Sequence, residues 1–245
     1  MSLSVLPTMS LGLASGGSAG GEAAYLAAQL ADSPVARWRL NETGGTVAVD
    51  DVGGYDGIYV ASPTLAAAGP WAGSKAAEWN GSTQYAQIPY NSALAPTSAV
   101  SIEIWAYRSA WGTQCGIGPN KTDSGGYGLW NISTGNKLRF YLSRGGSYAV
   151  IDSINSPAAG WHHIAGTYDG RYSRFYVDGA LQGSDDAGAS YPIHYLRTNS
   201  LVIGADANAG GGYQFPMSGK TVASAVYASA LSPARIAAHY AAAGI

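Results

Sequence analysis

The sequence predicts an all-β protein, a two-sheet antiparallel jelly-roll sandwich with a short helix near each end of the chain. Apolar and polar residues alternate with a period of two over most of its length, and Gly, Pro, Asn or Asp interrupts them about every 8–15 residues. Only 11% of the residues are charged, against roughly 25% in an average soluble protein. The 34 glycines and 17 tyrosines indicate many turns and aromatic rings. A chain of 245 residues suits a single sandwich domain.

The N-terminal segment, residues 1–21, is uncharged and rich in Gly and Ser from Ser15 onward. It cannot bury enough apolar surface to fold alone, so we expect a flexible arm. No Lys or Arg precedes Arg37, and Pro7 interrupts the apolar stretch, so we expect no secretory signal.

Residues 22–34 predict a short helix followed by a linker. Good helix formers run as far as Asp32, and Ser33-Pro34 ends the helix. Three apolar side chains recur at helical spacing and predict its buried face: Tyr25, Leu26 and Leu30.

Residues 35–245 predict the jelly-roll domain itself, closed by a helix over 232–243. Its period-two segments follow one another without a helix between them, which is typical of a sandwich or jelly roll. The expected strands are VARWRL, TVAVDD, YDGIYV, KAAEWNG, QYAQIP, AVSIEIWAY, YGLWNI, KLRFYLS, YAVIDS, WHHIAGTY, SRFYVDG, SLVIGA and TVASAVYA.

The closing helix has its own end signals. Ser232 is a good N-cap and Gly244 a good C-cap. Ile236 and Tyr240 share one face, which we expect to dock on the sandwich. His239 is interpreted as a surface or packing residue and not as a ligand.

The stretch WHHIAGTYDGRYSRFYVDG holds two adjacent histidines and two Asp-Gly pairs. In a strand, His162 and His163 point to opposite faces of the sheet, so they cannot bind one metal ion. Asp-Gly supplies the positive φ that tight hairpins need. We therefore interpret four residues as structural turns in a three-stranded meander: Asp169, Gly170, Asp178 and Gly179.

The same stretch, extended to WHHIAGTYDGRYSRFYVDGALQGS, resembles the central signature of LamG-like, concanavalin A-type lectin/glucanase jelly rolls. VARWRLNETGG resembles the opening strand of these domains, AVSIEIWAY a sheet strand ending in Trp, and residues 201–240 the closing hairpin and helix. The resemblance covers residues 24–244. It implies a jelly roll that binds glycans or proteins through loops at its rim, often with calcium. One departure is the segment Thr221–Ser224, where such domains commonly carry an acidic pair.

Catalysis is not expected. Glucanases of this fold carry Glu-x-Asp-x-x-Glu or a close variant, which is absent here. Glu103 lies on a predicted strand but lacks the second carboxylate at about 5–9 Å that glycoside hydrolysis needs. We interpret it as a glutamate hydrogen-bonded within a polar sheet face.

A sugar site needs aromatic rings for the apolar face of the sugar and planar polar groups for its hydroxyls. Two loop-rich regions, 108–133 and 204–215, supply both kinds of group. Trp130 is expected in the core, whereas core and binding roles stay open for Trp111 and Tyr213. The glycan-binding candidates are Trp111, Asn120, Asp123, Tyr127, Asp206, Asn208 and Tyr213.

No cofactor is required by the sequence, and Cys115 is the single cysteine, so no thiolate metal site is expected. A bound calcium ion is an open alternative, because calcium takes carboxylate oxygens from several loops. No spacing here is specific for calcium, and its site stays undetermined among Asp50, Asp51, Asp185 and Asp206.

These observations predict a non-enzymatic surface protein of a bacteriophage virion, in its tail, fibre or capsid decoration, since phage minor tail proteins resemble its helix leading into this fold. Residues 1–21 would dock on other virion subunits, and the sandwich would meet host-surface polysaccharide, with a homotrimer as one arrangement. The alternative is a bacterial extracellular carbohydrate-binding module, and a glycan hydrolase or lyase comes third. Scattered Lys and Arg argue against nucleic acid as a partner. The lack of about 18 consecutive apolar residues argues against membrane insertion.

Overall fold

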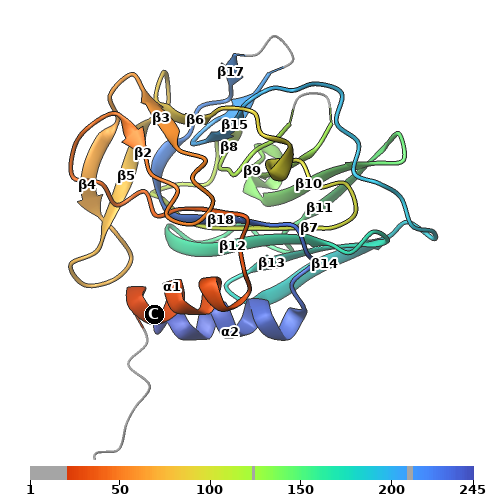
Figure 1. Cartoon of the computed structure of the whole chain (residues 1–245). Helices are drawn as coiled ribbons and strands as arrows, with labels where there is room; N and C mark the ends of the chain where they lie inside the picture. Colours follow the sequence, from red (N-terminus) through yellow and green to blue (C-terminus); the bar gives the residue numbers. More distant parts are fainter. Residues whose placement is uncertain (1–20, 123–124, 209–211) are drawn as a thin grey trace, which may run out of the picture.

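The computed structural model describes residues 21–122, 125–208 and 212–245. Two β layers pack face to face, and a pair of helices lies on the outer side of one layer (Figure 1). The predicted all-β sandwich with a helix near each end is confirmed. The expected arm lies almost wholly outside the described residues.

The larger layer is one antiparallel sheet in the order β14-β13-β12-β7-β18-β5-β4, with β1 also paired to β18. Its strands are β1 (Ala36–Trp38), β4 (Thr64–Ala68), β5 (Lys75–Asn80), β7 (Val100–Arg108), β12 (Gly160–Tyr168), β13 (Tyr172–Val177), β14 (Ala180–Asp186) and β18 (Ser218–Tyr227).

The opposite layer consists of two smaller sheets, in the orders β11-β10-β9-β8 and β15-β6-β3-β2. A bridge between Asn120 and Val202 joins them. Their strands are β2 (Val47–Ala48), β3 (Gly57–Val60), β6 (Tyr85–Ile88), β8 (Cys115–Gly116), β9 (Tyr127–Asn131), β10 (Leu138–Arg144), β11 (Ser147–Asp152) and β15 (Leu201–Ile203). A small hairpin, β16 (Asp206–Ala207) and β17 (Tyr213–Gln214), and two 3-10 turns, η1 (Ser92–Leu94) and η2 (Thr134–Asn136), complete the described elements.

The hydrophobic core fills the space between the layers. Alternate residues of each strand point inward, as with Ile102 and Ile104 on β7 and Leu129 on β9. The layers meet closely where Gly166 faces Phe140, because a Cβ atom at Gly166 would lie 2.3 Å from the Phe140 ring. Burial of these apolar side chains stabilises the fold by about 25 cal/mol per Å².

The helices α1 (Glu22–Ala31) and α2 (Pro233–Ala243) lie side by side on the outer face of the larger sheet (Figure 1). The Ser232 hydroxyl accepts a hydrogen bond from the Arg235 amide, and Gly244 ends α2 with φ 65°. Ile236 is buried, as expected. Leu30 is 48% exposed, contrary to expectation, because Gln29 takes the inward position and reaches into the sheet.

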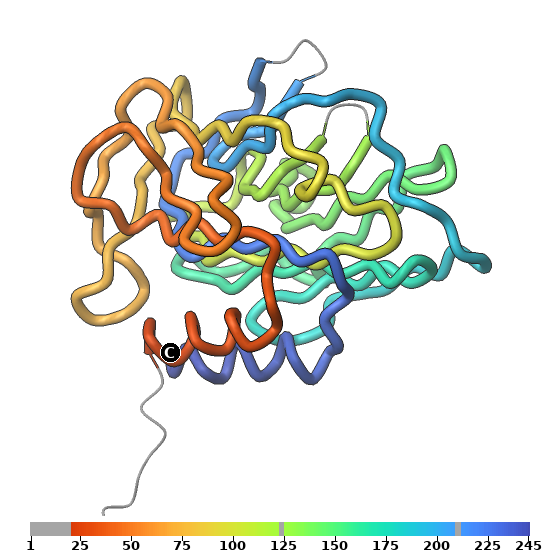
Figure 2. Tube along the Cα trace, viewed as in Figure 1, coloured from red at the N-terminus to blue at the C-terminus, as the bar shows by residue number. Residues whose placement is uncertain are grey.

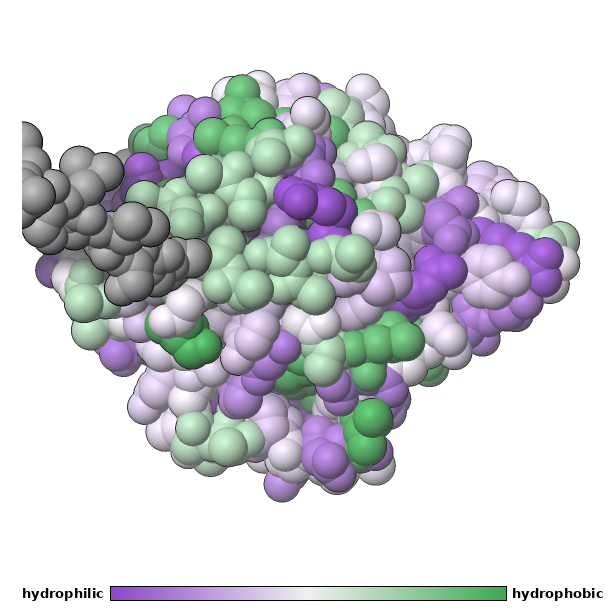
Figure 3. Space-filling view, turned by 90° about the horizontal axis from the view of Figure 1, so that it is seen from below, coloured by the Kyte–Doolittle hydropathy of each residue, from purple (hydrophilic) through white to green (hydrophobic). Residues whose placement is uncertain are grey.

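Pale green bands of weakly apolar residues run along the outward side of the helix pair, with hydrophilic groups beside them (Figure 3). Exposed alanines of both helices form these bands: Ala23, Ala27, Ala234, Ala237 and Ala241. Neither helix is long and apolar enough to cross a membrane, nor is any other helix within the described ranges.

The meander β12-β13-β14 has the predicted connectivity. Gly170 has φ 97° between the first two strands, and Asp178 and Gly179 have φ 50° and 72° between the second and third. Asp169 accepts the amides of Arg171 and Tyr172. These residues therefore form the turns of the meander.

Candidate functional site

Two of the expected glycan-binding residues lie in the core of the sandwich, which for Trp111 is one of the two positions left open by the sequence. Trp111 is 3% exposed and donates its indole N–H to the Ala158 carbonyl oxygen at 2.8 Å. Tyr127 is fully buried, and its hydroxyl donates to the Leu94 carbonyl oxygen at 2.7 Å. Both rings bury more apolar area inside the sandwich than a surface loop could offer them.

The other described candidates gather at the β16–β17 hairpin, and Asp123 lies outside the described residues. Asn120 is buried and donates to the Ala205 carbonyl oxygen at 2.7 Å. Asn208 accepts the Gly212 amide within the hairpin. The Tyr213 ring packs against Tyr85, with centroids 4.3 Å apart. These side chains therefore build the hairpin.

Asp206 lies at the base of this hairpin and is 2% exposed. Its carboxylate accepts hydrogen bonds from Gln214, at 2.8 Å, and from the Thr122 hydroxyl. Burial raises the pKa of Asp206 to about 7, although these two hydrogen bonds favour its charged form. Asp206 thus changes charge near neutral pH inside the hairpin.

The hairpin leads directly into an aromatic surface on the outer face of β9, β10 and β11. Leu129, Phe140 and Leu142 point into the core, so the residues that alternate with them point outward. Three of these outward residues are aromatic, and Phe215 joins them from the end of the hairpin. We call this surface the front platform; it consists of Trp130, Arg139, Tyr141, Tyr148, Asp152 and Phe215.

Aromatic pairs form each end of the front platform. The rings of Trp130 and Phe215 have centroids 5.6 Å apart, and those of Tyr141 and Tyr148 have centroids 5.3 Å apart. Tyr148 is 59% exposed and Phe215 is 40% exposed. Phe215 also has φ 49°, a conformation that is rare for a bulky residue. Its backbone carbonyl is held in place by the Gly116 amide at 2.9 Å.

An ion pair supplies the polar groups of the platform. Arg139 lies directly across from Trp130 on one side and from Asp152 on the other. Its guanidinium donates two hydrogen bonds to the Asp152 carboxylate, at 2.6 and 2.9 Å. Hydrogen bonding to Asp152 raises the pKa of Arg139. Both side chains are about one-third exposed, at 31% and 33%, so they can reach a bound hydroxyl group.

This surface was not expected from the sequence, because Trp130 was predicted to lie in the core. The signal was present in the period-two alternation: Trp130 is out of phase with Leu129, as Arg139 and Tyr141 are with Phe140. No local signal placed Phe215 beside Trp130, because that contact depends on the tertiary fold.

A family model for the concanavalin A-like lectin/glucanases superfamily matches residues 80–237, more than half of the chain. The chain belongs to this lectin/glucanase superfamily. No curated protein sequence matches the chain.

Solved structures with the superfamily fold resemble this chain at low identity. The binding domain of Paraclostridial Mosquitocidal Protein 1 has a TM-score of 0.66 and 15% identity, over 86% of this chain and 52% of that one. Domain 4 of the extracellular arabinanase AbnA from Geobacillus stearothermophilus, in complex with arabinotriose, has a TM-score of 0.59 and 16% identity, over 84% and 98%.

A structure of botulinum neurotoxin type C, whose cell entry depends on interaction with two ganglioside molecules, has a TM-score of 0.60 and 16% identity over 88% and 52%. The chain thus spans about half the length of both toxin structures. At these identities the likeness shows the shared fold.

In this lectin/glucanase-superfamily chain, Glu103 is sealed beneath the helix pair. It is fully buried and accepts hydrogen bonds from His163 at 2.8 Å, from Gln29 at 3.1 Å and from the Tyr227 hydroxyl. His239 lies between two carboxylates, with Nδ1 3.1 Å from Glu103 and Nε2 2.8 Å from Asp32. Glu103 is therefore a hydrogen-bonded glutamate of a polar sheet face.

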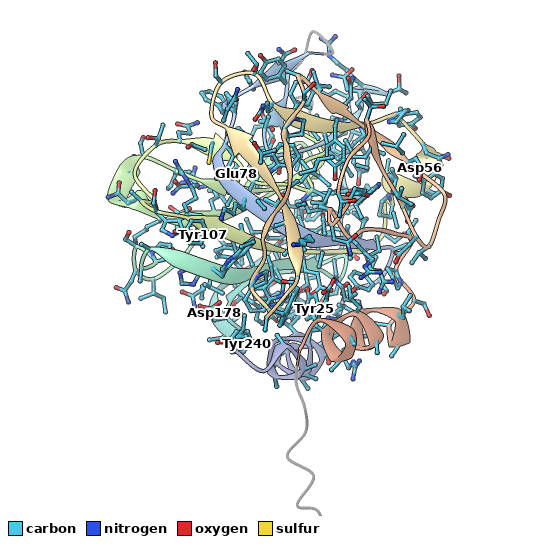
Figure 4. The ribbon with its side chains drawn as sticks, turned by 90° about the vertical axis from the view of Figure 1, so that its left-hand side faces the viewer. Tyr25, Asp56, Glu78, Tyr107, Asp178 and Tyr240 are labelled. Carbon is cyan, nitrogen blue, oxygen red and sulfur yellow. The ribbon has the colours of Figure 1, made fainter. Side chains whose placement is uncertain are left out.

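The electrostatics of this cluster favour a permanent charge. Burial opposes ionisation of Glu103, but the hydrogen bonds from His163 and His239 hold its pKa well below the usual range. Burial also opposes protonation of His239, yet Glu103 and Asp32 raise its pKa. Figure 4 shows Tyr25 and Tyr240 between the helices and the sheet. The cluster ties the helix pair to the sheet.

The aspartates considered as calcium ligands are engaged by protein groups and do not converge. Asp50 accepts backbone amides, among them those of Arg37 and Tyr55, while Asp51 pairs with the Arg37 guanidinium. Asp185 lies on a separate element, strand β14, and pairs with Arg144. Across the described residues, no three or more His, Cys, Asp or Glu side chains gather closely enough to hold a metal ion.

A second aromatic row crosses the outer face of the larger sheet, beyond the helices. Trp161, Tyr107, Lys220 and Glu78 are successive cross-strand partners on β12, β7, β18 and β5. Figure 4 shows Tyr107 and Glu78 on this face. The Lys220 ammonium lies 5.2 Å from the centre of the Tyr107 ring. Trp161 packs against an apolar cluster beneath the helices that includes Trp105. This row has fewer rings than the front platform and provides matched control positions.

Proposed function

We propose that the protein is a non-enzymatic carbohydrate-binding protein and that the front platform is its glycan-binding surface. The observation that carries the proposal is the set of four aromatic side chains around one Arg–Asp pair, about one-third exposed, on the outer face of the sandwich. The superfamily supports it, because its members include lectins.

The chemistry of the platform suits a sugar. Aromatic rings cover the apolar C–H face of a sugar ring, and this contact releases water from both surfaces. Arg139 can donate to sugar hydroxyl oxygens, and Asp152 can accept from sugar hydroxyl groups. Both groups are already oriented by their mutual hydrogen bonds, so binding costs little side-chain entropy.

Two structural neighbours support the same class of ligand. The AbnA domain was solved with arabinotriose, and the neurotoxin depends on gangliosides for cell entry. Binding of a glycan by the present chain is our inference from the platform together with these relatives.

The presence of a single carboxylate in the platform supports a binding role without catalysis. Hydrolysis by the common mechanism uses two carboxyl groups about 5–9 Å apart across the glycosidic bond. Asp152 is the only carboxylate in the platform as defined from the described residues, and it is paired with Arg139. Glu103 lies on the far layer under the helices.

Binding of the purified chain to an array of bacterial surface polysaccharides tests this proposal. Trp130→Ala should weaken binding at least about 5-fold, because truncating an aromatic anchor typically costs more than about 1 kcal/mol. Trp161→Ala, on the opposite layer, should leave binding unchanged. If no polysaccharide binds, or if both variants bind like the unmodified chain, the proposal is overturned.

We further propose that the protein acts on an exposed surface: a phage virion in its tail, fibre or capsid, or, as the alternative, the outside of a bacterial cell. Deletion of residues 1–21 distinguishes the two. A virion protein would lose assembly onto other virion subunits and keep glycan binding, whereas an extracellular module would be unaffected. A homotrimer stays a prediction, to be measured by light scattering.

A further inference from the structure

We infer that the front platform binds a run of about four sugar units of a neutral, linear glycan, laid diagonally across β9, β10 and β11. This inference rests on the proposed function and adds the class, the length and the direction of the ligand.

The strand register places three of the rings on one diagonal line. Trp130 on β9 is opposite Arg139 of β10, Tyr141 is two residues further along β10, and Tyr148 on β11 is opposite Ser143, two residues further again. Each step crosses one strand, about 4.8 Å, and advances two residues, about 6.8 Å. The backbone positions of the three rings therefore span about 17 Å.

Phe215 extends the Trp130 end of this line. A linked sugar ring spans about 5 Å, which is close to the spacing of adjacent strands, so the line from Phe215 to Tyr148 is as long as roughly four linked sugar rings. Single-sugar recognition would need only one of the two aromatic pairs. The presence of a pair at each end points to a ligand that contacts both.

The charges on the platform favour a neutral ligand. Arg139 is neutralised by two hydrogen bonds to Asp152, and Arg144, next to the Tyr148 end, is paired with Asp185. An anionic sugar would have to displace a carboxylate from one of these arginines, and would leave that carboxylate beside its own charge. Neutral hydroxyl groups can add to these pairs without breaking them.

Neither cross-strand neighbour of Tyr141 carries a long side chain, although the side chains of Asn120 and Thr122 lie over Gly128. The outward residues next to Tyr141 across the sheet are Gly128 and Val150. Gly128 has no side chain, and Val150 is short and 48% exposed. No bulky side chain from these two positions therefore separates one aromatic pair from the other.

Calorimetric titration with neutral gluco-, xylo-, manno- and arabino-oligosaccharides of two to six units tests the inference, together with oligogalacturonates as the anionic series. In the neutral series that binds, affinity should rise about 10-fold or more from the dimer to the tetramer and then level off. Tyr148→Ala should remove most of that rise. Tyr90→Ala replaces a tyrosine that is 42% exposed and lies outside the platform, and it should change nothing.

The outcomes separate the inference from the proposed function. Equal affinity for dimers and hexamers, or tighter binding of oligogalacturonates, overturns the inference while glycan binding stands. Absence of binding to every series overturns both. Tyr148→Phe keeps the ring, so it should retain the length dependence and shows that any loss in Tyr148→Ala does not reflect misfolding.

Discussion

Phe215 packs against Trp130 with ring centroids 5.6 Å apart, although the two residues come from distant parts of the chain. The contact joins the β16–β17 hairpin to β9 and makes the hairpin a structural part of the front platform. Phe215 holds this position with a positive φ, which costs backbone energy in a bulky residue.

The hairpin should therefore contribute to ligand binding. Phe215→Ala removes the ring that packs on Trp130, and we expect a loss of about 5- to 20-fold in glycan affinity. Tyr90→Ala serves as the control. Fluorescence titration detects the change, because Trp130 lies in the contact. An unchanged affinity would mean that the platform ends at Trp130.

The ion pair on the platform should set the charge preference. Asp152→Asn leaves Arg139 with its charge but without its carboxylate partner, so we expect weaker discrimination against anionic glycans. The ratio of the affinities for matched neutral and acidic oligosaccharides measures this discrimination. The same substitution at Asp51, which pairs with Arg37 elsewhere, should not alter the preference. Retained discrimination in Asp152→Asn would contradict this role.

The buried Asp206 should make the fold less stable as pH rises. Burial raises its pKa to about 7, above the ordinary value of 3.8, so the folded state binds this proton more tightly than the unfolded state. Its contribution is full below about pH 4 and is lost as pH rises through about 7. We expect Asp206→Asn to raise the free energy of unfolding by about 1–3 kcal/mol at pH 8 relative to pH 5.

Urea unfolding of both proteins at the two pH values provides this measurement. If the free energy of unfolding of the variant changes between the two pH values as much as that of the unmodified chain, Asp206 does not titrate in this range. The comparison must be made between variants, because His239 also has a raised pKa and its stabilisation is likewise lost as pH rises.

The cluster beneath the helices should be structural. Glu103→Gln removes the carboxylate that faces His239, and leaving a buried charge without its partner costs about 3 kcal/mol. Urea unfolding should show this loss, while the folded fraction should bind glycan with unchanged affinity. Release of reducing sugars by the unmodified chain, lost in Glu103→Gln, would instead make Glu103 a catalytic residue.

Glycan binding should not require calcium. Asp50, Asp51, Asp185 and Asp206 are each engaged by amides, arginines or neutral side chains, and none belongs to the front platform. We expect equal affinity with calcium and with a chelator present. A loss of binding on chelation, restored by calcium, would place a metal ion in the site.

The sequence was sufficient for the strands, the end helices and the turns, since all depend on local periodicity and capping. Ser232 and Gly244 bound α2 as expected, and Asp178-Gly179 turns the meander. It was insufficient where side chains from separate segments meet. Trp111 and Tyr127 were candidates because of their residue type, yet the packing of the sandwich buries them. The contact of Phe215 with Trp130 depends on how the hairpin folds over the sheet.

The helix pair also determines how the molecule can be held. The Gly21 amide donates to the Ala242 carbonyl oxygen at 3.0 Å, so the described chain enters and leaves at the same place (Figure 2). The front platform lies on the opposite layer of the sandwich (Figure 1). A carrier fused before residue 21 or after residue 245 would therefore be attached on the helix side of the molecule. The front platform, on the opposite side, would stay accessible to another surface.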